Sequence, residues 1–158
     1  MPHMEPTQTS HQADKLFRAL ADPTRLRILC ILREGEHCVS DIVEILQVPQ
    51  AKASHHLNYL HRVGMVDFRQ QGLWCFYRLS PGRSLFHRQL LACLAHCSRE
   101  VPNAAADRRR AARLREKGGC CPGLARGATV TVHHASPGEL ESAPAGNPQE
   151  PSPGAPSD

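Results

Sequence analysis

The sequence predicts a mainly α-helical domain that carries one β-hairpin. Apolar residues recur at helical spacing through most of the first two-thirds of the chain, and two β-rich segments flank a glycine-containing turn near its middle. A third observation limits the domain, because seven of the 13 prolines fall after residue 117. A segment of that composition buries too little apolar surface to offset the entropy cost of ordering.

The 158 residues therefore predict one domain with flexible ends. We expect a flexible arm at 1–11, a folded domain at 12–100, a basic C-terminal helix with a vicinal cysteine pair at 101–121, and a disordered proline-rich tail at 122–158. The core of such a domain is small, and dimerisation would help to stabilise it. The net charge of +4 is concentrated in the front part, since the tail holds one cation and four acids.

The first three helices follow from apolar spacing and from residues that favour helix ends. Leu16, Phe17 and Leu20 share one helical face, and Asp22-Pro23 is typical of an N-cap followed by proline at the first position of a second helix. That helix is expected to stop near Gly35. Ser40 is expected to cap a short third helix.

A fourth helix and a hairpin complete the pattern. Val48-Pro49 closes the third helix and opens the fourth, at about 50–62, so that the two helices form a helix-turn-helix. The segments 65–69 and 73–79, separated by Gln70-Gln71-Gly72, predict a hairpin whose aromatic residues pack on the helices. A helix-turn-helix followed by a hairpin predicts a winged helix. Two more helices are expected, at 84–98 and 103–117.

Four motifs occur in order along residues 12–100. They are Phe17-Arg-Ala-Leu-Ala-Asp-Pro-Thr-Arg-Leu-Arg-Ile-Leu, Cys38-Val-Ser-Asp-Ile, Ser54-His-His-Leu-Asn-Tyr-Leu and Gly72-Leu-Trp-Cys-Phe-Tyr-Arg-Leu. Together they strongly resemble the ArsR family of bacterial metalloregulatory repressors. The resemblance implies a homodimer, joined through the first and fifth helices, that binds double-stranded operator DNA. It also implies release from the DNA when a toxic metal or metalloid binds.

The fourth helix and the hairpin supply the expected DNA contacts. An exposed helix with polar side chains can reach phosphates and base edges in a major groove. Lys52 and Ser54 are assigned to phosphate, and Gln50, His55 and Asn58 to base readout. The full predicted set is Gln50, Lys52, Ser54, His55, His56, Asn58, Arg69 and Arg78. The alternatives are a solvated helix face and, for the two arginines, ordinary strand-end cations.

Sulfur is the expected ligand for the inducer, because soft thiolates select thiophilic ions such as trivalent arsenic or antimony. Cys120-Cys121 resembles the C-terminal pair of family members that respond to organoarsenicals, and Cys93 or Cys97 could add a third sulfur. Family arsenic repressors carry Cys-Val-Cys-Asp where this chain has Cys38-Val39-Ser40-Asp41, so a ligand of the inorganic arsenic site is replaced. Cys38 is then expected to be a partly buried apolar residue.

Other sensing mechanisms are possible for these thiols, and the sequence excludes some classes of protein. The pair could instead sense thiol oxidation or another soft metal such as cadmium, or the protein could have no metal ligand. The sequence has no Cys-x-x-Cys motif, no phosphate-binding glycine loop and no nucleophile with an identifiable base, so we do not expect an enzyme. No resident cofactor is expected either. The seven cysteines form no disulfide framework, and no apolar run long enough for a membrane span occurs, so we expect a cytoplasmic protein.

Overall fold

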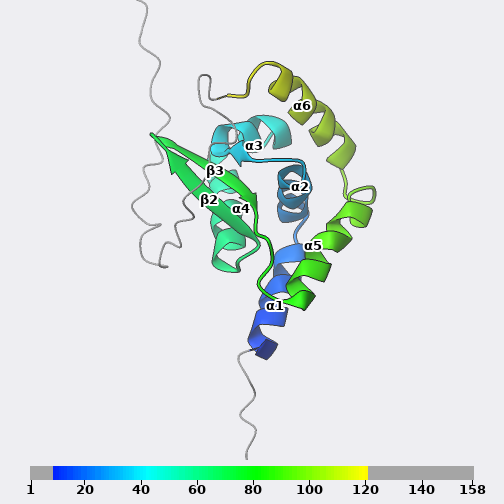
Figure 1. Ribbon diagram of the computed structural model, residues 1–158. Coiled ribbons are helices and arrows are strands. Elements are labelled where there is room, and N and C mark those ends of the chain that lie inside the picture. The colour runs from blue at the N-terminus through cyan, green and yellow to red at the C-terminus, as the bar shows by residue number, and fades with distance from the viewer. Residues whose placement is uncertain (1–8, 121–158) are drawn as a thin grey trace, which may run out of the picture.

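The computed structural model describes residues 9–120, with side chains from residue 12 (Figure 1). The elements are α1 (Thr9–Leu20), α2 (Pro23–Leu32), β1 (His37–Cys38), α3 (Val39–Leu46), α4 (Gln50–Arg62), β2 (Val66–Gln71), β3 (Trp74–Leu79), α5 (Leu85–Cys97) and α6 (Ala104–Glu116). α1 begins at Thr9, within the segment expected as an N-terminal arm. Residues 1–8, Cys121 and the predicted tail at 122–158 lie outside the described residues.

The predicted hairpin is confirmed, and a short third strand joins it. The sheet order is β1-β3-β2, antiparallel throughout, with His37 opposite Tyr77 and Cys38 opposite Phe76. Two residues are too few to show a strand period, so β1 could not be predicted. The turn is also tighter than expected, because Gln70 and Gln71 belong to β2 and Gly72, at φ 60°, occupies the first central position of a two-residue loop.

Helix ends explain two further differences from the prediction. Asp22 caps α2 as expected, since its carboxylate accepts from the backbone N–H of Arg25 at 2.9 Å. The cap of α3 is Cys38 and not Ser40: its Sγ accepts from the N–H of Asp41 at 3.4 Å, while the Asp41 carboxylate accepts from the N–H of Cys38 at 3.3 Å. This reciprocal pairing requires the partner to lie three positions after the cap, a spacing that Cys38 and Asp41 meet. α2 ends at Leu32, before Gly35.

One main core lies between the helices and the hairpin, and α6 contributes Ala111 to it. Its large fully buried apolar side chains are Leu16, Ile28, Leu29, Ile42, Ile45, Leu46, Leu57, Leu60, Met65 and Leu94. Phe76 and Tyr77 are buried as predicted, and Trp74 is half-buried beside Cys38 and Phe76. None of the helices in the described part of the chain has the length and hydropathy to cross a membrane.

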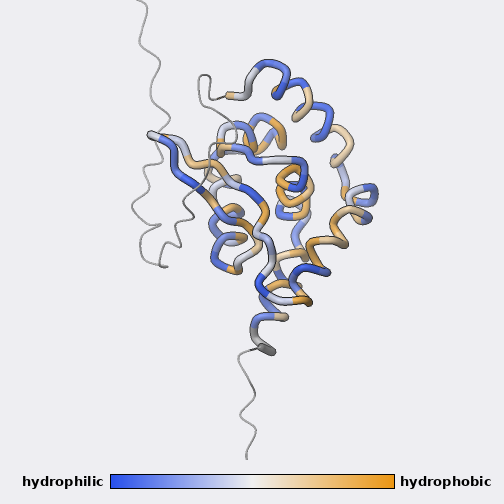
Figure 2. The backbone as a smooth tube through the Cα atoms, viewed as in Figure 1, coloured by the Kyte–Doolittle hydropathy of each residue, from blue (hydrophilic) through white to orange (hydrophobic). Residues whose placement is uncertain are grey.

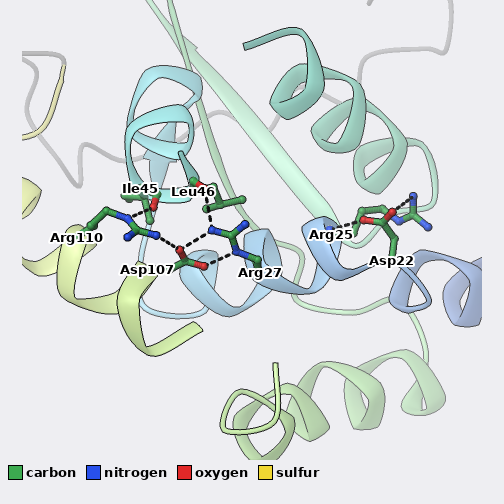
Figure 3. A network of polar contacts seen from close by, with 7 residues as sticks. All are labelled: Asp22, Arg25, Arg27, Ile45, Leu46, Asp107 and Arg110. Carbon is green, nitrogen blue, oxygen red and sulfur yellow. Dashed lines mark hydrogen bonds and ion pairs between the residues drawn. The ribbon is translucent and has the colours of Figure 1, made fainter. Parts of the chain in front are cut away.

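α6 is strongly hydrophilic, yet it is part of the packed domain (Figure 2). Asp107 is fully buried and accepts from Nε and Nη2 of Arg27 on α2 at 2.6 and 2.7 Å. Arg27 also donates to the Leu46 carbonyl, and Arg110 donates to Asp107 and to the Ile45 carbonyl (Figure 3). This network fastens α6 to α2 and to the C-terminal end of α3. We call it the Asp107 network.

Candidate nucleic-acid interface and thiol site

α4 presents a polar outer face, as predicted. Ala53, Leu57 and Leu60 are buried against the core, and this orientation turns the polar residues outward. Gln50, Lys52 and His55 are exposed, and Ser54 and Asn58 are half-buried. The link from α3 is short because Gln47 turns the chain in the left-handed region, at φ 55°, directly before Val48-Pro49. α3 and α4 therefore have the connection that a helix-turn-helix requires.

His56 does not belong to this outer face. Its side chain is buried, with Nδ1 3.8 Å from a carboxylate oxygen of Asp22. Burial lowers the pKa of His56, which favours the neutral imidazole, although the Asp22 carboxylate opposes this shift. The expectation that His56 is exposed for DNA contact is wrong, because a helix turns 100° per residue and places its neighbour His55 outward instead.

The two arginines of the wing differ in their surroundings. Arg69 is buried, and its Nε donates to both carboxylate oxygens of Glu36 at 2.9 and 3.0 Å. Its guanidinium also lies 4.6 Å above the Phe76 ring. The hydrogen bonds with Glu36 raise the pKa of Arg69. The structure thus favours the alternative that Arg69 is an ordinary cation of the strand and not a DNA contact. Arg78 is half-buried and lies opposite Asp67.

A thiol site that the sequence did not reveal lies where α3 begins. Cys120, after α6, packs against the cluster formed by Cys38 and Phe76, which Trp74 also contacts. The backbone N–H of Cys120 donates to Asp41 Oδ1 at 2.8 Å. Cys38 itself is fully buried, more deeply than the partial burial expected for it. The capping spacing of Cys38 and Asp41 was visible in the sequence, but their contact with residue 120 was not.

The environment of this site sets its protonation. Burial, helped by the nearby Asp41 carboxylate and Cys38, raises the pKa of the Cys120 thiol to about 12. Although burial acts to raise it, the pKa of Asp41 falls to about 2, because the carboxylate accepts hydrogen bonds from His37 and from backbone N–H groups. Cys120 is therefore a neutral thiol beside an ionised carboxylate, so a ligand that binds its sulfur must displace the thiol proton.

The remaining thiols lie elsewhere. Cys97 is half-buried against the main core and Cys93 is exposed, both on α5, while burial raises the pKa of Cys30 to about 11. The C-terminal end of α6 lies beside α3 and away from α5 (Figure 1). The structure thus does not bring Cys93 or Cys97 of the same chain to Cys120. Among residues 9–120, no three His, Cys, Asp or Glu side chains are arranged to hold a metal ion.

An apolar surface covers part of α1 and α5. Phe17 is 55% exposed, Leu85 65% and Phe86 41%. The rings of Phe17 and Phe86 meet edge to face, with centroids 5.5 Å apart, so the two helices share one apolar face. Large apolar side chains clustered in this way mark an interaction surface. We call these three residues the α1–α5 face.

The helix-turn-helix, the exposed polar α4 and the hairpin define a winged-helix DNA-binding protein. Residues 22–67 match the family model described as bacterial regulatory protein, arsR family. The chain is 40% identical over 91 residues to the arsenical resistance operon repressor of Escherichia coli K12. The matched region covers 57% of this chain and 78% of that protein. The chain belongs to the ArsR family of transcriptional repressors.

The chain is also similar to a regulator of resistance to another metal and to a solved winged-helix domain. A cadmium resistance transcriptional regulatory protein, the CadC homolog of Staphylococcus aureus, is 42% identical over 66 residues, covering 41% of this chain and 54% of its own. The homodimeric winged helix-turn-helix domain of Mb0332 from Mycobacterium bovis, solved by NMR, superposes with a TM-score of 0.53 at 26% identity, over 65% of this chain and 94% of that one. These relatives are regulators of transcription and not enzymes, in agreement with the prediction from the sequence.

Proposed function

We propose that this repressor controls a metalloid-resistance operon and leaves its operator when a trivalent arsenical binds cysteine thiolates. The observation that carries the proposal is the position of Cys120, which lies against the first turn of α3, the helix that precedes α4. A ligand bound there acts close to the DNA-binding helix. The adjacent Cys121, outside the described residues, makes Cys120-Cys121 the sensing pair.

An organoarsenical is favoured over inorganic arsenite as the inducer. Each carbon on trivalent arsenic removes one bonding position, so a monosubstituted arsenical needs two sulfurs and arsenite needs three. Ser40 replaces a sulfur that the best-known arsenic repressors carry on the third helix. A hydroxyl is a hard donor and a poor substitute for thiolate. Antimony(III) would require the same three sulfurs as arsenite.

The DNA interface consists of the outer face of α4 and the wing. Lys52 and Ser54 contact phosphates, and Gln50, His55 and Asn58 read base edges in the major groove. Arg78 is the remaining candidate for a wing contact, since Arg69 is held by Glu36. His56 is left out because it is buried. Affinity for the operator should fall steeply with salt.

The active form is a homodimer joined through α1 and α5. The α1–α5 face supports this arrangement, because its three large apolar side chains gain from being covered by a second copy. A two-fold dimer places two copies of α4 on successive major grooves. We expect an operator with inverted half-sites about one helical turn apart.

The test is fluorescence anisotropy with DNA from the upstream region of the protein's own gene. Phenylarsine oxide, then arsenite, is added to the complex of the parent and of a Cys120→Ser, Cys121→Ser double variant. We expect phenylarsine oxide to release the parent and not the double variant. If the parent stays bound with both compounds, or the double variant responds like the parent, the proposed sensor is wrong.

The cadmium resistance relative favours one competing inducer. Adding cadmium and then hydrogen peroxide to the same complex separates the possibilities. Release by cadmium alone would identify a soft-metal sensor, and release by peroxide alone would identify an oxidation sensor. The raised pKa of Cys120 argues against the second, because oxidation proceeds through thiolates.

A further inference from the structure

Cys38 and Cys120 are 82 positions apart in the sequence and meet in one small cluster. Cys38 lies between β1 and α3, and Cys120 follows α6. The first side chain is fully buried and the second is half-buried, so Cys120 provides access from solvent.

One residue, Asp41, holds both cysteines in place. Its backbone N–H donates to Cys38 Sγ at 3.4 Å, and its carboxylate accepts from the N–H of Cys38 at 3.3 Å. The same carboxylate accepts from the N–H of Cys120 at 2.8 Å. These bonds fix the backbone of both cysteines before any ligand arrives. A preorganised site loses less entropy on binding.

We propose that Cys38 and Cys120 of one chain are the two sulfurs that bind a monosubstituted trivalent arsenical. This inference rests on the proposed function and deepens it, because it names Cys38 of the same chain, in place of Cys121, as the second sulfur beside Cys120 and leaves Cys93 and Cys97 out of the site. Two S–H bonds and the arsenic–oxygen bonds of phenylarsine oxide break, two S–As bonds form, and one water leaves. Arsenic remains trivalent, so the step needs no oxidant or reductant.

Two features of the site select this ligand. Two sulfurs satisfy an arsenic atom that already carries one carbon, whereas structural zinc requires four ligands. Residues 9–120 supply no set of three metal ligands at this place. The aromatic side chains Trp74 and Phe76 border the thiols and offer an apolar contact for the organic group on arsenic.

The site also lies on the helix that positions α4. Cys38 caps α3 through its sulfur, so binding arsenic at that sulfur competes with the hydrogen bond from Asp41. The other end of α3 is fixed to α6 by the Asp107 network. Cys120 follows α6 in the chain. An arsenical that joins Cys120 to Cys38 would therefore link α6 to the N-terminal end of α3 as well as to its C-terminal end. The effect on DNA binding would then begin within one subunit.

Tryptophan fluorescence gives a direct test, because Trp74 is the only tryptophan of the chain and contacts this cluster. The full-length protein is titrated with phenylarsine oxide without DNA. We expect the emission of Trp74 to change and to saturate at one equivalent per chain. Cys38→Ser keeps a good helix cap while removing the sulfur, so the variant should fold. Its affinity should fall by about 100-fold, because one sulfur loses the effective concentration of the second.

Cys97→Ser and Cys93→Ser are the matched controls and should bind like the parent. Peptide mapping gives a second readout that does not depend on how a variant folds. Trypsin places Cys38 in peptide 34–52, Cys120 in 118–126, and Cys93 with Cys97 in 89–99. In the parent, one phenylarsenic should join peptides 34–52 and 118–126.

The outcomes separate this inference from the proposed function. An adduct confined to peptide 118–126, with normal binding by Cys38→Ser, would place the arsenical on Cys120 and Cys121 and overturn the inference while the proposed function stands. An adduct on 89–99 would also overturn it. If the arsenical joins 34–52 to 118–126 and DNA is nevertheless not released, the site exists and the proposed function fails.

Discussion

At the scale of single residues, two carboxylates bond to backbone N–H groups at the starts of α2 and α3. Asp22 caps α2 and also faces the buried His56 (Figure 3 shows the cap with Arg25). Asp41, in the first turn of α3, accepts from the N–H of the capping residue Cys38, lies beside the buried His37 and in addition holds Cys120. Both carboxylates have lowered pKa values, although burial opposes the shift in each case. Ionised carboxylates at these positions are therefore part of the folded state.

Asp22→Ala tests the first of these caps. We expect the variant to lose about 1 kcal/mol of unfolding free energy at pH 7, measured by urea titration, because the N–H of Arg25 loses its acceptor. The folded-state pKa of Asp22 lies below its ordinary value of 3.8, so its stabilisation is present above that value and is lost as the pH falls through the folded-state pKa. The difference between parent and variant should shrink in acid.

Asp14→Ala is the control for this experiment, because Asp14 is exposed on α1. It should leave the stability unchanged within about 0.5 kcal/mol at either pH. A loss of the same size in both variants would show that the effect comes from net charge and not from the cap.

At the scale of elements, α6 is held by buried charge in addition to a narrow apolar stripe that includes Ala111 and Leu114. Its sequence is mostly Ala and Arg, yet Asp107 and Ala111 are fully buried in the contact with α2 and α3. The Asp107 network satisfies the carbonyls of Ile45 and Leu46, which end α3 and have no partner within the helix. α6 thus stabilises the helix that precedes α4.

Asp107→Ala should be strongly destabilising. It leaves the Arg27 guanidinium, only 13% exposed, without its carboxylate, and removing one partner of a buried pair costs about 3 kcal/mol or more. Urea unfolding measures the loss. Arg108→Ala removes an exposed ion pair with Glu34 from the same helix and should cost less than about 1 kcal/mol. Equal losses would mean that the network contributes no more than a surface pair.

At the scale of the whole molecule, the winged helix leaves one apolar face uncovered. The α1–α5 face lies on two helices that run side by side at one end of the molecule (Figure 1). α4 is a separate polar surface of the same domain. A dimer through the apolar face therefore leaves α4 free for DNA.

Phe17→Asp tests this arrangement, because it places a charge in the centre of the proposed interface. We expect the variant to sediment as a monomer in analytical ultracentrifugation and to bind operator DNA more weakly, since half of the contacts are lost. Leu73→Asp is the control for the oligomeric state alone and should stay dimeric, because Leu73 is 72% exposed at the tip of the wing, away from this face. A Phe17→Asp variant that remains dimeric would place the interface elsewhere.

Much of this protein is determined by the sequence alone. The spacing of apolar residues, the Asp22-Pro23 start signal and the glycine turn at Gly72 are local patterns, and they predicted the helices and the hairpin to within a few residues. The outer face of α4 was predictable for the same reason, because helix periodicity decides which side chains turn outward. The prediction for His56 was wrong because the polar face was taken to include a position that the helix turns toward the core.

Only the tertiary structure decided which distant residues meet. The partnership of Arg69 with Glu36, the burial of Asp107 against Arg27 and the packing of Cys120 on Cys38 join residues between 33 and 82 positions apart. Local periodicity carries no information about such contacts, because they depend on how whole helices pack. The sequence showed that the thiols exist, whereas the packing of α6 on α3 brought two of them together.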